Sequence, residues 1–126
     1  MRTEPLKPIP IYTTAGDSEA FLVFPHLYNL LGEWLGFVTP IKDVYSIRGD
    51  YVGWLSDGPR ILRKRSYDYS KPKLKPPSKP SRIMPPATIP LAPMMSELTF
   101  DTIDVLMEEP DLLPTADRGE LREDMD

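Results

Sequence analysis

One sequence pattern occurs three times in the first 60 residues, and this repeat constrains the fold more than any other feature of the chain. The pattern is Tyr, three residues, Gly, Asp or Glu, two residues, Ala or Gly, an aromatic residue and an aliphatic residue. Its copies begin at Tyr12, Tyr28 and Tyr45, with offsets of 16 and 17 residues. Repeats of this kind indicate similar structural units that pack against one another.

Each copy has the turn chemistry of a β-hairpin. Gly16, Gly32 and Gly49 stand four residues after the Tyr and directly before an acidic residue. Glycine enters the positive-φ region of a tight turn without steric cost. We therefore predict a strand that ends near each Tyr, a turn at each Gly and a returning strand.

The residues after the turn alternate as the two faces of a strand do. In the second copy, this alternation places Trp34, Gly36 and Val38 on one face and Leu35 and Phe37 on the other. The Ala or Gly position in mid-strand indicates close approach of another backbone.

The aromatic residues that follow this small position are Phe21, Phe37 and Trp54. Because they hold equivalent positions in the three copies, we expect them to form equivalent contacts in a shared core.

The spacing fits one hairpin per repeat, and no hairpin buries its apolar face alone. We therefore predict an all-β domain over residues 9–66, preceded by an N-terminal arm over residues 1–8. Three clear hairpins and one degenerate one would surround a pseudo-symmetric core. The fourth copy begins near Ile61 and has Ser66 in place of the turn Gly, which favours a single closing strand, with Pro8 to Ile11 as its candidate partner.

These units resemble the four-fold beta flower family. The resemblance covers residues 9–65 and rests on the Tyr, Gly-acidic and aromatic-aliphatic positions given above. It implies a bacterial protein in which short hairpins surround a pseudo-four-fold axis. The family has no established activity, so the resemblance implies no catalytic residues.

The composition changes sharply after the repeats. Of the 16 prolines in the chain, eight lie between Pro72 and Pro93, and Lys and Ser accompany them. Such a segment buries too little apolar surface to fold alone. We expect a basic, extended, polyproline-like linker over residues 67–94, within a largely disordered tail. It can be a solvated spacer, an arm that contacts phosphates, or a proline-rich ligand for a small domain.

Residues 95–113 are acidic but also rich in apolar side chains. We predict a short helix capped by Asp101 and stopped by Pro110, which would order only against another surface. This segment is a candidate docking motif, the alternative being an acidic solubilising tail, and an acidic disordered tail is expected over residues 114–126. The candidate docking residues are Leu98, Phe100, Ile103, Val105, Leu106 and Met107.

The sequence offers little material for catalysis or cofactor binding. The chain has no cysteine and one histidine, His26, and it lacks a phosphate-binding glycine loop and a nucleophile motif. We predict no enzyme, no cofactor and no metal site. Without an apolar signal segment or a membrane span, a soluble cytoplasmic location is expected.

The net charge of −4 conceals blocks of opposite sign: residues 60–82 hold nine basic and one acidic side chain, and residues 83–126 hold two basic and eleven acidic ones. We predict a non-catalytic protein-interaction module, whose partner is another protein or a second copy of the chain. The alternative is a nucleic-acid-associated protein that uses the basic segment. Its candidate residues are Arg60, Arg63, Lys64, Arg65, Lys71, Lys73 and Lys75.

Overall fold

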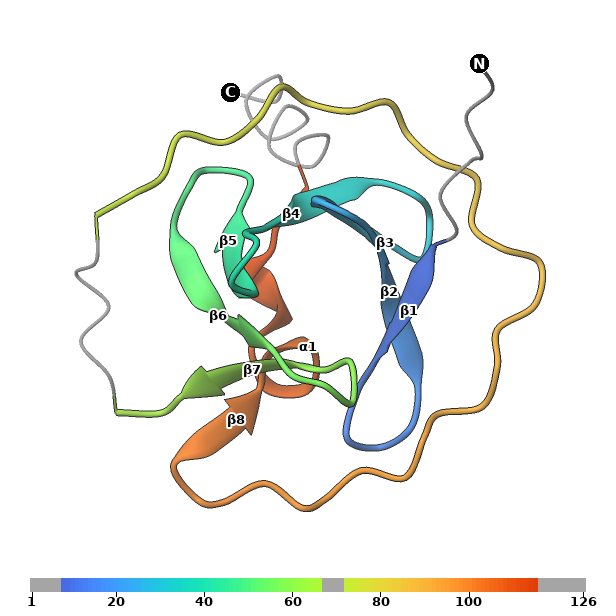
Figure 1. The fold of residues 1–126 in the computed structure, drawn as a ribbon, viewed down its shortest axis with the longest axis vertical. Helices are drawn as coiled ribbons and strands as arrows, with labels where there is room; N and C mark the ends of the chain where they lie inside the picture. Colours follow the sequence, from blue (N-terminus) through green and yellow to red (C-terminus); the bar gives the residue numbers. More distant parts are fainter. Residues whose placement is uncertain (1–7, 67–71, 116–126) are drawn as a thin grey trace, which may run out of the picture.

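The computed structural model describes residues 8–66 and 72–115 (Figure 1). In this part of the chain, eight strands form one antiparallel sheet in which every strand pairs with its neighbours in sequence. The all-β prediction is therefore confirmed. The strands are β1 (Ile9–Tyr12), β2 (Ser18–Val23), β3 (His26–Asn29), β4 (Trp34–Val38), β5 (Asp43–Ser46), β6 (Tyr51–Leu55), β7 (Ile61–Lys64) and β8 (Thr102–Asp104).

The three sequence repeats are the hairpins β1–β2, β3–β4 and β5–β6. Gly16, Gly32 and Gly49 have φ angles of 96°, 83° and 88°, so all three occupy the region predicted for them. In every turn the glycine N–H donates a hydrogen bond to the carbonyl oxygen three residues earlier. Local chemistry thus specifies each hairpin separately.

A β-bulge in each hairpin changes which residues face the core. In the second hairpin, Leu27 lies opposite Gly36 and Tyr28 lies opposite Trp34, so Leu35 is an extra residue without a partner. Leu35 packs in the core cluster together with Val38. The strict alternation predicted from sequence is therefore wrong at this position, because the bulge turns Leu35 to the inner face.

The curled sheet encloses an aliphatic core. Ile11, Leu27, Val44 and Ile61 hold the same position in the four units, and all four are fully buried in the core cluster. One side chain from each unit thus contributes to the core, which is therefore shared between the repeats as the sequence predicted.

Two of the three repeat aromatics lie opposite tyrosines of the next hairpin, and none lies opposite another repeat aromatic. In the strand register Phe21 faces Tyr28 and Phe37 faces Tyr45, whereas Trp54 faces Leu62. The rings of Phe37 and Tyr45 stack with centroids 5.4 Å apart. These aromatics therefore join each hairpin to the next one, and Trp54 remains half-buried.

The fourth unit is completed by a distant part of the chain. β7 pairs with β8, so residues 65–101 separate the two strands of the last hairpin. β1 does not pair with β7, contrary to the proposed pairing of residues 8–11. Instead, the Tyr12 N–H donates to the carbonyl oxygen of Pro59, shortly before β7, at 2.8 Å.

The segment after β8 crosses the middle of the curled sheet (Figure 1). Val105 and Leu113 are buried in the same core cluster as the repeat residues. A short helix is present, α1 (Val105–Glu108), followed by one 3₁₀ turn, η1 (Pro110–Leu112). The helix begins at the Asp104 cap rather than at the predicted Asp101, because residues 102–104 are taken into the sheet.

Residues 72–101, here called the arm, contain no helix or strand and pass around the outside of the sheet (Figure 1). This agrees with the extended conformation predicted for the proline-rich segment, and it shows in addition that the segment returns to its own domain. Within residues 8–66 and 72–115, no helix has the length and apolar character needed to cross a membrane.

Candidate functional site

The arm binds the third hairpin at its turn glycine. The Leu74 N–H donates to the Gly49 carbonyl oxygen at 3.0 Å. A Cβ atom at Gly49 would overlap the carbonyl oxygen of Leu74, so this position needs glycine both for its φ angle and for the arm. Lys73 adds an ion pair, with Nζ 3.4 Å from Oδ1 of Asp50.

The second hairpin holds the arm in the same way. The Ile83 N–H donates to the Gly32 carbonyl oxygen at 3.1 Å, and a Cβ at Gly32 would overlap the Ile83 carbonyl oxygen. The Arg82 Nε donates to the Leu31 carbonyl oxygen at 3.1 Å. A basic residue followed by an aliphatic one thus docks on two equivalent turns.

Two further contacts tie the end of the arm to the sheet. The Tyr12 hydroxyl donates to the Pro90 carbonyl oxygen at 2.6 Å. The buried Arg60 donates from Nη1 to the Ser96 carbonyl oxygen at 3.2 Å and to the Thr14 hydroxyl at 3.0 Å. The basic residue Arg60 is therefore part of the domain's interior.

A buried carboxylate joins the first hairpin to β8. Oδ2 of Asp104 accepts hydrogen bonds from the Thr14 N–H at 2.7 Å and from the Thr14 hydroxyl at 2.8 Å. Asp104 is fully buried, and these hydrogen bonds at Oδ2 offset part of the carboxylate's loss of hydration. They connect the two ends of the curled sheet.

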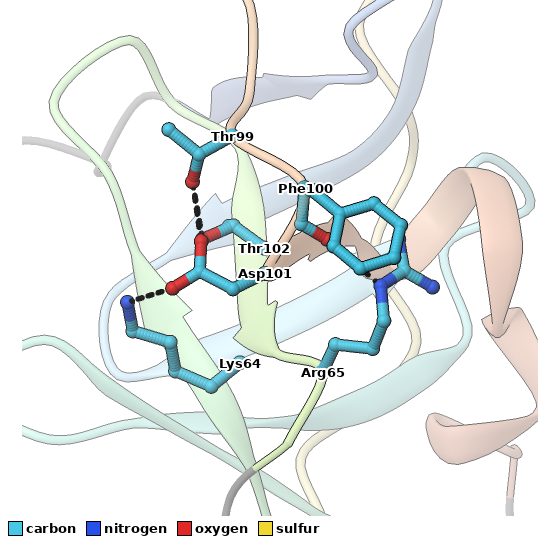
Figure 2. A network of polar contacts seen from close by, with 6 residues as sticks. All are labelled: Lys64, Arg65, Thr99, Phe100, Asp101 and Thr102. Carbon is cyan, nitrogen blue, oxygen red and sulfur yellow. Dashed lines mark hydrogen bonds and ion pairs between the residues drawn. The ribbon is translucent and has the colours of Figure 1, made fainter.

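The arm re-enters the sheet through a network of exposed polar contacts (Figure 2). The Asp101 carboxylate accepts hydrogen bonds from the Thr99 hydroxyl at 2.5 Å and from Lys64 Nζ at 3.0 Å. Arg65 donates from Nε to the Phe100 carbonyl oxygen at 2.9 Å, and its guanidinium carbon lies 5.1 Å from the Phe100 ring centroid.

The same contacts lower the pKa of Asp101. Hydrogen bonds from Thr99 and then Lys64 favour the ionised carboxylate and hold its pKa at about 2, below the ordinary 3.8. The network is therefore fully formed at neutral pH and weakens only in acid.

The structure separates the six candidate docking residues into two groups. Ile103 and Val105 are buried in the domain, and Leu98 and Leu106 are half-buried. Phe100 and Met107 are exposed. Most of the predicted docking motif therefore contacts its own sheet, which is the surface against which this segment is ordered.

Most of the candidate nucleic-acid residues also contact the domain itself. Lys64 and Lys73 form the ion pairs described above, and Arg63 and Arg65 each lie 3.9 Å from a glutamate carboxylate. Lys75 is exposed, and Lys71 lies outside the described residues. The basic segment therefore does not present a continuous free surface.

His26 lies in β3, against the edge of Trp34, with ring centroids 5.9 Å apart. Burial lowers the pKa of His26, so its imidazole is neutral at pH 7. Among the described residues, no three His, Cys, Asp or Glu side chains come together as a metal site would require.

Sequence reasoning did not single out Leu74 and Ile83, although a signal for them is present. The arm contains a motif of a basic residue, an aliphatic residue, any residue and two prolines, which occurs at residues 73–77 and again at residues 82–86. Nine arm residues thus separate the N–H that docks at Gly49 from the N–H that docks at Gly32.

Comparison of the chain with family models, with curated proteins and with solved structures found no match.

Proposed function

We propose that this protein is a non-catalytic protein-interaction module that presents its arm to another protein. The supporting observation is that the backbone of the arm is hydrogen-bonded to the domain, while several of its large apolar side chains are exposed. The arm is held at Gly32, Gly49 and Tyr12, whereas Met84, Met94 and Phe100 are each at least 86% exposed. An extended segment that is already ordered loses little conformational entropy on binding.

Two further features support a protein partner. A protein that lies along the arm would bury these apolar side chains, and the burial of apolar surface favours association. The ionic contacts of Lys64 and Lys73 within the domain leave few cations for phosphates, which favours a protein over the nucleic-acid alternative.

We further propose that the domain belongs with the four-fold beta flower proteins. The support is that Ile11, Leu27, Val44 and Ile61 hold equivalent positions in the four units and are all buried in one core cluster.

The test compares three forms of the full chain as bait in lysate with and without nuclease treatment, with bound proteins identified by mass spectrometry. In the arm-face variant, Met84, Met94 and Phe100 are each replaced by Ser. The control variant carries Lys75→Ala and Lys79→Ala on the same arm. Circular dichroism and thermal unfolding verify that all three forms are folded.

We expect a partner that the wild type and the lysine control retain and that the arm-face variant loses at least tenfold. The proposal is rejected if the arm-face variant retains the same proteins. Loss on the lysine variant or on nuclease treatment supports the nucleic-acid alternative instead.

A further inference from the structure

The first hairpin has the same turn as the two hairpins that hold the arm, but no arm segment docks on it. Gly16 has the φ angle of its two equivalents, and Asp17 corresponds to Glu33 and Asp50. Nothing lies within 4 Å of the position that a Cβ would take at Gly16, whereas Gly32 and Gly49 are covered by arm carbonyl groups. The same turn site is therefore present in all three hairpins, and the arm docks on two of them.

The arm sequence explains why the third site is open. A further step of nine residues after Arg82 and Ile83 leads to Leu91 and Ala92, where neither the basic residue nor the large aliphatic residue is present. The Leu91 side chain is 94% exposed. The arm passes the first turn at a distance, with Pro90 held by the Tyr12 hydroxyl instead.

The space between the arm and this turn is an open groove of about 440 Å³. Tyr12, Gly16 and Asp17 line one wall and Pro90 and Leu91 line the other. Among the described residues, no cation contacts the Asp17 carboxylate.

We propose that this groove binds a proline-rich peptide of a partner protein, with a basic residue, Leu or Ile, any residue and two prolines in sequence. The N–H of the aliphatic residue donates to the Gly16 carbonyl oxygen, as Leu74 and Ile83 donate at the two occupied turns. The basic side chain pairs with Asp17, as Lys73 pairs with Asp50 at the third hairpin. The prolines keep the peptide extended and lower the entropy lost on binding. This site lies apart from Met84, Met94 and Phe100 and so goes beyond the proposed function.

The occupant is a partner peptide rather than the chain's own arm, because both copies of the motif are already docked at Gly32 and Gly49. A second copy of the protein would have to release one of these contacts before its motif could reach the groove. A free peptide with the same motif has no such contact to break.

The test titrates full-length ¹⁵N-labelled protein with a synthetic peptide that copies residues 81–87. We expect saturable shifts of the amides of residues 13–18, while the amides of Gly32 and Gly49 stay unchanged. A matched peptide with N-methyl isoleucine lacks the key N–H and leaves the Gly16 carbonyl unpaired, so it should bind about tenfold more weakly.

Two protein variants locate the site. Gly16→Asn tolerates a positive φ but places a Cβ where the peptide carbonyl would lie, so it should abolish binding. Asp17→Asn keeps the turn and removes only the charge, so it should weaken binding about threefold to tenfold and reduce its salt dependence. The second variant keeps the test decisive if Gly16→Asn proves to be unfolded.

Three results would overturn the proposal. One is the absence of saturable shifts at residues 13–18. Another is a shift of Gly32 or Gly49, since the peptide would then be exchanging with the arm. The third is sedimentation evidence for a dimer whose residues 13–18 already shift with protein concentration, which would make a second copy the occupant. None of these results bears on the arm-face variant, so the two proposals fail independently.

Discussion

The repeated hairpins and the arm satisfy their backbone polar groups in different ways. Each hairpin pairs its own strands, with a glycine turn and an alternating apolar face that local sequence provides. The arm has no ladder of its own, and its prolines lack the N–H groups that would need one. Its N–H groups at Leu74 and Ile83 donate to hairpin carbonyl oxygens. Its carbonyl oxygens at Pro90 and Ser96 accept hydrogen bonds from Tyr12 and Arg60 of the sheet. The hairpins are thus locally specified, whereas the arm takes its order from the hairpins.

The residues that follow the arm pair and pack as the hairpins do, but like the arm they depend on the rest of the domain for their order. β8 supplies the missing strand of the fourth unit, and Val105 and Leu113 fill the core. A segment that sequence alone presents as a tail is therefore required to complete the domain. The predictions below test this division, beginning with the largest expected effect.

The first prediction concerns the core role of the C-terminal residues. Leu113→Ala should lower the free energy of unfolding by about 2–5 kcal/mol, because it leaves a cavity among buried aliphatic side chains. Urea denaturation measures the change. The control is Leu91→Ala, which removes the same atoms from an exposed arm residue and should change stability by less than about 0.5 kcal/mol. Equal effects of the two variants would contradict the distinction between C-terminal residues that complete the core and arm residues that do not.

The second prediction tests the link between the first hairpin and β8. Asp104→Ala should cost about 1–3 kcal/mol, because it leaves the Thr14 N–H and hydroxyl without their buried acceptor. Asp104→Asn keeps one acceptor oxygen in place and should recover part of this loss. If thermal unfolding shows no difference between Asp104→Ala and the wild type, the two ends of the sheet are not joined as described.

The third prediction separates the two roles of the turn glycines. Gly32→Asn and Gly16→Asn impose the same backbone requirement, but only the variant at position 32 places a Cβ against the arm. Gly32→Asn should therefore release the middle of the arm and accelerate its proteolysis, whereas Gly16→Asn should not. Limited proteolysis followed by mass spectrometry compares them. Equal cleavage of the arm in both variants would show that Gly32 does not hold it.

The smallest effect is expected from pH. The folded pKa of Asp101 is about 2 and lies below its ordinary 3.8, so its network stabilises the folded state above pH 3.8 and loses this contribution as the pH falls towards 2. Asp101→Asn should remove this part of the acid dependence. The Arg65 amide, which donates to the Asp101 carbonyl oxygen at 2.7 Å, reports the change by hydrogen exchange. An identical acid profile in the variant would contradict the assignment.

The hairpins were predictable because their determinants are local. Each turn is specified within five consecutive residues. Its determinants are the glycine, which is Gly16, Gly32 or Gly49, and the acidic residue directly after it. The bulge was not predictable from alternation, because it depends on how β3 and β4 are paired, and it places Leu35 in the core.

The role of the C-terminal residues depends on contacts across most of the chain. Leu112 and Leu113 are identical neighbours in sequence, and only the tertiary structure buries Leu113 more deeply. The docking motif predicted over residues 95–113 was based on the apolar side chains of this segment. The surface that covers some of these side chains is the domain itself. The motif at residues 73–77 and 82–86 is visible in the sequence, but its meaning requires the position of the hairpin turns.

Amide hydrogen exchange of the full chain, resolved by residue, tests the central claim most directly. If the arm is docked, the Leu74 and Ile83 amides exchange more slowly than those of Lys75 and Met84, which lie in the same extended segment. Slow exchange at these two positions, lost selectively at Ile83 in Gly32→Asn, is the expected result. Exchange at the rate of an unstructured peptide throughout residues 72–101 would contradict an arm that takes its order from the hairpins.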